Sequence, residues 1–323
     1  MNRNEERAES RNLSNWQFIA MMILIVVVWA FAFPFIKIGL NELSFANLTI
    51  MRFFVVCVIL LTILLLKSEL FSKLHKQDII PIFILGFFGV IVYHLGLNYG
   101  EQFISPGAAS LIIATIPVYI IVLAAVFLNE KISRIKLLGI ILALGGVLII
   151  SIWGTEDISI EIRYISAALA VLVAAIMGAL YTIAGKKLLE RYNGLSLTVY
   201  AILLGSIGLI PFILLSNFGL ISFISKPLLD EVAAMSTDGW IAIIFLGIFS
   251  TVIGYIIWYV ALEMKTASEI SIYLYAIPVI STIVSYFFFG DEITLMFILG
   301  GILVIAGLII VNMKTKHNNK KID

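Results

Sequence analysis

The sequence predicts an all-α polytopic membrane protein of ten transmembrane helices, arranged as two inverted five-helix repeats. Three observations lead to this fold class: the composition, a series of long apolar runs and an internal repeat. Of the 323 residues, 62% are hydrophobic and only 13% are charged, and the mean hydropathy is +1.11. A soluble domain could not cover its surface with so few polar groups.

The apolar runs set the number of spans, because a transmembrane helix needs about 20 predominantly apolar residues. Ten runs are close to this length, near residues 17–37, 46–66, 79–98, 105–128, 135–152, 164–185, 195–216, 239–262, 268–289 and 294–313. The first run is too long for the core of a signal peptide, lacks a small-x-small cleavage site and leads directly into further spans. We therefore expect it to remain as a helix.

The basic residues indicate how the spans are oriented. If the chain starts in the cytoplasm, 17 of the 21 Lys and Arg residues fall in cytoplasmic segments, and three, Lys37, Arg163 and Lys226, fall outside. This bias over short loops is the positive-inside pattern. The sequence thus predicts a multi-pass protein of the cytoplasmic membrane, with cytoplasmic tails at 1–15 and 314–323. The net charge of +1 and the absence of a basic cluster give no indication of nucleic-acid binding.

An internal repeat relates the two halves of the chain. A shift of 161 residues, without a gap, superimposes Ile116-Pro117-Val118 on Ile277-Pro278-Val279 and Leu85-Gly86 on Leu246-Gly247. Matched prolines and glycines in one register are harder to obtain by chance than matched Leu or Ile. Each unit holds five spans, so the second unit enters the membrane from the opposite side. Inverted repeats are typical of secondary transporters, with a binding site near the midplane.

The motifs carried by these repeats resemble those of the EamA branch of the drug/metabolite transporter superfamily. The matching stretches are "WAFAFPFIKIGL", "TIMRFF", "GAASLIIATIPVY" with "FLNEKIS", and in the second copy "ASEISIYLYAIPVI" with "FFGDEIT". The resemblance covers nearly the whole chain, as one repeat at 16–155 and a second at 156–313. It implies alternating access around a central cavity lined by the first, third, fourth, sixth, eighth and ninth spans.

Candidate solute-binding residues are aromatic or polar side chains on those spans. Trp29 and Phe33 are four residues apart and share a helix face, which Lys37 extends by another turn; Lys37 could contact solute or extend to the outer membrane interface. Histidines in helices are more often core residues than ligands, and aromatic side chains also form interfacial belts. The predicted set is Trp29, Phe33, His94, Asn98, Tyr181, Tyr255, Trp258 and Tyr273.

Prolines within three spans suggest bends. Pro34, Pro117 and Pro278 each remove one helical hydrogen bond, and Pro117 and Pro278 are related by the 161-residue shift. We predict that these three prolines act as hinges, although prolines in membrane helices are often only structural. The glycines of the fifth and tenth spans, Gly139, Gly146, Gly300 and Gly307, suggest close helix packing.

Arg52 is a charge within the second span, where a buried ion is costly. It could reach the headgroups, or form a structural contact with Glu101 or with free carbonyls, or contact the solute. We assign it a structural role and consider direct solute contact the least favoured of these.

These features favour a secondary transporter for a small organic metabolite, such as an amino acid or a similar amphipathic solute. The alternative is an intramembrane enzyme acting on lipid-linked substrates, which would need clustered ligands or acid–base pairs. The three histidines lie far apart in sequence, and Cys57 is the single cysteine. We therefore predict no catalytic residues, no metal site, no cofactor and no obligatory protein partner; the solute and the lipid bilayer are the expected partners.

The positions of the titratable residues suggest how transport is driven. Every Asp and Glu, including Glu101, falls outside the spans or within about a turn of their ends, and His94 is the midspan group that could titrate near neutral pH. A proton-coupled carrier needs a titratable group accessible to solute and protons. The sequence therefore predicts uniport or solute exchange.

Overall fold

The computed structural model describes residues 14–128, 134–153, 162–217, 227–290 and 293–312, and all regular structure in these ranges is helical. Six helical segments are long and apolar enough to cross a membrane, and four shorter apolar helices lie between 106–120, 137–150, 273–289 and 295–307. Together these segments occupy the ten predicted runs, which confirms the all-α membrane fold. The tails predicted at 1–15 and 314–323 lie almost entirely outside the described residues.

The first repeat begins with α2 (Asn15–Leu40), whose first turn is closed by a capping box between Ser14 and Gln17. It continues with α3 (Phe45–Leu66), the short 3₁₀ turns η1 (Ser68–Leu70) and η2 (Lys76–Asp78), and a third span built from α4 (Ile79–Gly86), η3 (Phe87–Val92) and α5 (Tyr93–Glu101). The fourth and fifth spans are α6 (Pro106–Ile113) with α7 (Ile116–Leu128), and α8 (Arg134–Trp153).

The second repeat has five spans in the same order, although the short elements within and between them differ. It consists of α9 (Ile162–Leu188), then α10 (Gly194–Ser206), η4 (Ile207–Leu209) and α11 (Ile210–Asn217), and the short helix α12 (Leu228–Ala234). Its third span is α13 (Thr237–Ile244), η5 (Phe245–Ile253) and α14 (Gly254–Met264). The last two are α15 (Ala267–Ser271), η6 (Ile272–Tyr275) and α16 (Ala276–Phe289), and α17 (Leu295–Asn312). Ser44, Ser105 and Asn193 cap the N-termini of α3, α6 and α10, so side-chain oxygens accept from otherwise unbonded amides.

The third span of each repeat contains a π-helical segment at an equivalent position. These segments are η3, over Phe87–Val92, and η5, over Phe245–Ile253. The 161-residue shift places the whole of η3 within η5. π-Helical turns are rare and occur often at functional sites. The sequence did not predict them.

In two of the predicted spans, the helix is interrupted beside the repeat-related prolines. The run 105–128 is two helices, α6 and α7, which separate at Ala114–Thr115 just before Pro117. The run 268–289 is α15, the 3₁₀ segment η6 and α16, which begins two residues before Pro278. In contrast, α2 continues through Pro34 without an interruption. That these prolines act as hinges stays a prediction.

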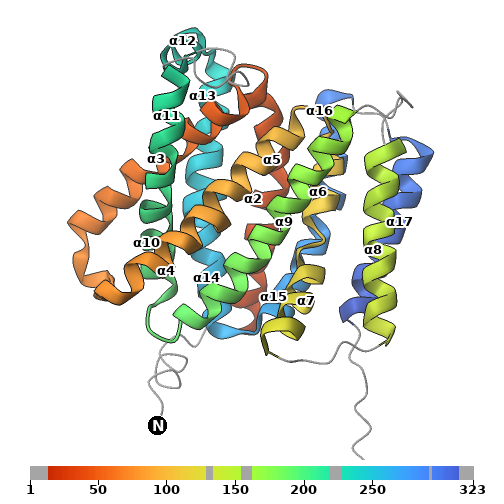
Figure 1. The fold of residues 1–323 in the computed structure, drawn as a ribbon, viewed down its shortest axis with the longest axis horizontal. Helices are drawn as coiled ribbons and strands as arrows, with labels where there is room; N and C mark the ends of the chain where they lie inside the picture. Colours follow the sequence, from red (N-terminus) through yellow and green to blue (C-terminus); the bar gives the residue numbers. More distant parts are fainter. Residues whose placement is uncertain (1–13, 129–133, 154–161, 218–226, 291–292, 313–323) are drawn as a thin grey trace, which may run out of the picture.

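The two repeats interdigitate, because the first span of each packs on the third span of the other. α2 packs along α13, η5 and α14, and α9 packs along η3 and α5. The start of α2 and the end of α17 lie toward the same end of the molecule (Figure 1). This arrangement leaves the third spans of both repeats facing the centre.

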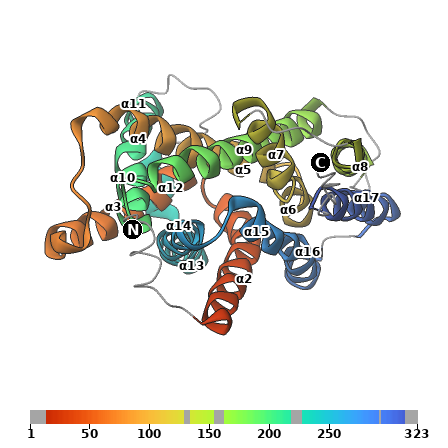
Figure 2. The ribbon, with the colours of Figure 1, turned by 90° about the horizontal axis from the view of Figure 1, so that it is seen from below.

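The fifth spans of the two repeats form a separate pair, α8 and α17, side by side at one edge of the bundle (Figure 2). A Cβ atom at Gly146 would lie 2.5 Å from the Gly300 carbonyl oxygen, and one at Gly307 would lie 2.5 Å from the Gly139 carbonyl oxygen. These glycines therefore allow the backbones to touch, as the sequence predicted.

Candidate solute-binding cavity

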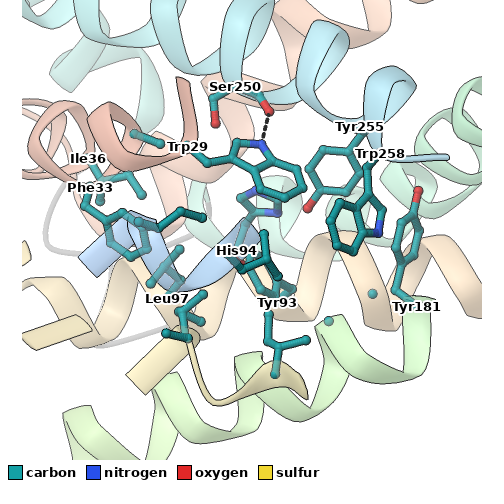
Figure 3. A pocket seen from close by; sticks show the side chains of 18 of the residues that line it. Trp29, Phe33, Ile36, Tyr93, His94, Leu97, Tyr181, Ser250, Tyr255 and Trp258 are labelled. Atoms are coloured by element: carbon teal, nitrogen blue, oxygen red, sulfur yellow. Dashed lines mark hydrogen bonds between the residues drawn. The ribbon is translucent and has the colours of Figure 1, made fainter. Parts of the chain in front are cut away.

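A cavity lies where the two repeats meet, and both repeats contribute its walls (Figure 3). Six of the eight predicted solute-binding residues line it: Trp29, Phe33, His94, Tyr181, Tyr255 and Trp258. The prediction placed these six side chains on four different spans, and the fold brings them to one site. Their role in binding remains a prediction.

The cavity walls follow the repeat symmetry. On the third and fourth spans, the 161-residue shift pairs the lining residues Gly89 with Ser250, His94 with Tyr255, Leu97 with Trp258, Ile113 with Leu274 and Ile116 with Ile277. On the first spans, a shift of 149 residues pairs Trp29 with Gly178, Ala32 with Tyr181 and Phe33 with Thr182. The pseudo-twofold relation between the repeats therefore passes through the cavity.

The shift of 149 residues, which relates the first two spans of each repeat, was not predicted from the sequence. It is visible in Leu48-Thr49 and Leu197-Thr198, where each threonine hydroxyl donates to the carbonyl four residues earlier, at 2.8 Å and 2.7 Å. The register also pairs the N-caps Ser44 and Asn193. A gapped comparison of the two halves would have found it.

Trp29 is held in a fixed position at the cavity wall. Its indole Nε1–H donates to the backbone carbonyl of Ser250 at 3.0 Å, and its ring lies 6.1 Å from Tyr255 and 5.4 Å from Trp258. A Cβ atom at Gly254 would lie 2.5 Å from the indole nitrogen, so this close approach needs a glycine. Figure 3 shows the bond between Trp29 and Ser250 and the aromatic side chains around it.

His94 belongs to the same aromatic cluster. Its Nδ1 lies 2.6 Å from the Val90 carbonyl oxygen, and since a carbonyl only accepts, Nδ1 donates. The neutral ring then carries its acceptor lone pair on Nε2. The imidazole also contacts the rings of Phe53, Tyr93 and Tyr255, with centroids 5.0, 4.9 and 6.0 Å away.

Arg52 lines the cavity as well. Its side chain is only 2% exposed, so the suggestion that it reaches the headgroups is wrong. Its Nε donates to the Thr251 hydroxyl at 2.8 Å, and its Nη2 donates to the Ser250 hydroxyl at 3.0 Å. These bonds tie α3 to the π-helical segment η5, as a structural role would require. However, the cavity also reaches this side chain.

Two predicted solute-binding residues do not line the cavity. Asn98 is fully buried and donates from Nδ2 to the Thr49 hydroxyl at 2.9 Å, which joins α5 to α3. Tyr273 is half-buried in η6, and its ring lies 6.4 Å from Phe18 near the start of α2. Their distance from the cavity could not be read from the sequence, because helix rotation decides which face turns inward.

Two lysines at equivalent positions join the ends of helices within their own repeats. Lys37, in the last turn of α2, donates to the Glu101 carbonyl at the end of α5 at 3.3 Å. Lys186, in the last turn of α9, donates to the Leu262 carbonyl at the end of α14 and to the Lys265 carbonyl. The 149-residue register pairs the lysines, and the 161-residue register pairs Glu101 with Leu262.

These lysine contacts lie at opposite ends of the molecule. Lys265 lies over the ring of Phe18, near the start of α2, at 6.0 Å. Lys186 is therefore near the end of the bundle where α2 begins, whereas Lys37 lies where α2 ends. Within the described residues, no group of three or more His, Cys, Asp or Glu side chains is placed to hold a metal ion.

Comparisons with known proteins agree with this architecture. Residues 16–152 and 165–313 match the EamA-like transporter family. An uncharacterized transporter of Archaeoglobus fulgidus is 37% identical, over 91% of this chain and 98% of its own length. A probable terminal-alkyne amino-acid exporter of Streptantibioticus cattleyicolor is 32% identical, over 91% and 93%.

The fold has a counterpart among solved structures. A crystal structure that is 15% identical in sequence superimposes with a TM-score of 0.62, over 92% of this chain and 96% of the other. The matched family is one of transporters, and the two sequence relatives are named as a transporter and a probable exporter, so this chain is a transporter rather than an intramembrane enzyme. The chain belongs to the EamA-like transporter family.

Proposed function

We propose that this protein is a carrier that moves a small amphipathic organic solute, such as an amino acid, across the cytoplasmic membrane by alternating access. The observation that carries the proposal is the cavity between the repeats. Aromatic and aliphatic side chains form most of its lining, and a few polar groups, among them Arg52, His94 and Thr182, accompany them. Small-molecule sites commonly combine such walls with a few convergent polar groups.

A relative supports the class of solute. The protein of Streptantibioticus cattleyicolor that is 32% identical is named a probable terminal-alkyne amino-acid exporter. An amino acid with an apolar side chain would fit the aromatic wall formed by Trp29, Tyr255 and Trp258. Its polar end would then lie against the polar groups of the lining.

The two lysine contacts support alternating access. Lys37 joins the first span to the third span at one end of the molecule, and Lys186 joins the sixth span to the eighth at the other. Because the repeats are inverted, one contact can break while its counterpart remains, so the cavity would open to one side at a time. The interrupted helices before Pro117 and Pro278 would supply the bends.

The orientation proposed for this cycle places both termini in the cytoplasm, on the basis of the positive-inside bias. Lys73, an exposed residue between α3 and α4, would face the cytoplasm, and the exposed Leu229 of α12 would face outward. Single cysteines at these positions, in a Cys57→Ser background, should react differently with an impermeant thiol reagent applied to intact cells. Labelling at position 73 rather than 229 would reverse the orientation.

Transport itself is tested with the purified protein reconstituted into sealed liposomes. Liposomes preloaded with one unlabelled apolar amino acid should accumulate the same amino acid in radiolabelled form from outside, since exchange needs no other driving force. L-leucine, L-methionine and L-phenylalanine would serve as probes, and protein-free liposomes as the control. Flux no greater than in the control for a wide panel of amphipathic solutes would contradict the carrier assignment.

A further inference from the structure

The cavity carries one permanent charge among its described lining residues, the guanidinium of Arg52. The residue lies in α3 and is almost completely buried, at 2% exposure. A buried cation in a membrane protein is costly and is usually found at a functional site. The groups that contact the guanidinium therefore indicate whether Arg52 has a structural or a binding role.

The direct hydrogen-bond partners of Arg52 are neutral. The hydroxyls of Ser250 and Thr251 accept from Nη2 and Nε, and Thr251 in turn donates to the Leu246 carbonyl at 2.8 Å. Since a guanidinium has five N–H donors, these two bonds leave others for a ligand. Glu101, at the end of α5, is also buried but does not line the cavity.

The position of Arg52 has no charged counterpart in the other repeat. The 149-residue register, which aligns the capped starts of α3 and α10, places Ala201 there. Other elements of the framework, such as the π-helical segments, the interrupted helices and the lysine contacts, occur in both repeats. The architecture thus forms in one repeat without this arginine, which argues for a role in the asymmetric task of binding a solute.

We propose that Arg52 binds the carboxylate of the solute, so that the carrier selects carboxylate-bearing molecules with an apolar body. A planar guanidinium matches a carboxylate in a paired, bidentate geometry. One positive charge balances one negative charge, and the aromatic walls around Trp29 and Tyr255 suit the apolar remainder. This inference rests on the proposed function, because it names the chemical group recognised in the same cavity.

The test compares acids with matched amides, which keep the body of the solute but remove the anionic group. The probes are L-leucine, L-methionine and L-phenylalanine, their C-terminal amides, and 4-methylpentanoate, which keeps the carboxylate of leucine without its amine. Stabilisation of the purified full-length protein against thermal unfolding, measured over a concentration series, reports binding. Exchange flux in liposomes reports transport.

Wild-type protein is expected to bind at least one acid with an affinity at least about tenfold higher than that for its amide. Arg52→Gln should reduce this acid-to-amide ratio to about one, and Arg52→Lys should keep part of it. If leucine is the acid that binds, 4-methylpentanoate should bind as well.

The matched control is Thr251→Val, which removes a hydroxyl partner of Arg52 without placing a new group in the cavity. If Arg52 binds the carboxylate, Thr251→Val keeps the preference for acids. If Arg52 is only structural, Thr251→Val and Arg52→Gln should change stability and flux to a similar extent. Neither variant should then change the ratio of acid affinity to amide affinity, and that result would overturn the proposal. Equal flux of acid and amide through the wild-type protein would support the carrier function but contradict the carboxylate assignment. Failure of every acid to bind would also overturn the inference.

Discussion

Trp29 in the first repeat donates its indole N–H to the backbone carbonyl of Ser250 in the second repeat, at 3.0 Å. The bond joins α2 to the π-helical segment η5 and holds the indole ring at the wall of the cavity. It is thus both a contact between the repeats and a part of the candidate site.

Trp29→Phe keeps an aromatic ring and removes this donor. We expect the variant to lower the free energy of unfolding by about 1 kcal/mol, the usual net contribution of one hydrogen bond. Thermal unfolding in detergent measures the effect. Trp240→Phe is the control, because Trp240 is 39% exposed on α13, and an equal shift in both variants would contradict the contribution of the bond.

Tyr255 is expected to contribute to solute binding. Its ring lies against Trp29, Tyr181 and His94, so Tyr255→Ala would remove the centre of the aromatic cluster. We expect solute affinity to fall about tenfold or more, since truncating a central aromatic side chain commonly costs more than 1 kcal/mol of binding free energy. Phe212→Ala, on α11 and away from the cavity lining, should change affinity little at comparable folding. Similar losses in both variants would argue against the assignment.

Removing either of the two lysine contacts is expected to change access to the cavity, and the two removals should act in opposite directions. In the proposed orientation, Lys37→Ala should weaken the closure at the outer end and Lys186→Ala the closure at the cytoplasmic end. A cysteine at the cavity-lining position Ala32, in a Cys57→Ser background, reports access from outside through its rate of reaction with an impermeant reagent. Lys37→Ala should raise that rate and Lys186→Ala should lower it; changes in the same direction would be inconsistent with paired closures.

The pair formed by α8 and α17 offers a test of packing with adjacent glycines. A Cβ atom at Gly146 would lie 2.5 Å from the Gly300 carbonyl oxygen, whereas one at Gly145 has no neighbour within 4 Å. Gly146→Ala should therefore destabilise the protein by about 1–3 kcal/mol through overpacking. Gly145→Ala should be neutral or slightly stabilising, because alanine favours the helix. Thermal unfolding of the two variants measures the difference.

Proton coupling is predicted to be absent. In liposomes with clamped voltage, an imposed pH gradient should not drive accumulation of an electroneutral solute, because uniport and exchange follow only solute gradients. Accumulation driven by pH alone would contradict this prediction. In that case His94→Gln identifies the coupling group: loss of accumulation with downhill flux intact would assign coupling to His94, and no effect would direct attention to Glu101, which is fully buried at the end of α5.

The sequence by itself determined the membrane class, the helical runs and the inverted repeat, because each depends on local composition or on residues in one register. Length and apolarity define a span wherever it packs, and the matched Pro117 and Pro278 mark one element in both halves. The aromatic and polar residues on inward-facing spans were also recognisable, and most of them reach the cavity.

Tertiary structure alone decided how these parts meet. Helix rotation places His94 in the cavity and turns Asn98, one turn later, toward Thr49. Packing of α3 against η5 buries Arg52 against two hydroxyls at the cavity wall. The π-helical segments could not be predicted from the sequence either, because an apolar run does not specify which helical turn widens. These features depend on contacts between residues far apart in the chain, with a separation of 49 for Asn98 and Thr49 and of 198 for Arg52 and Ser250, and no local pattern encodes them.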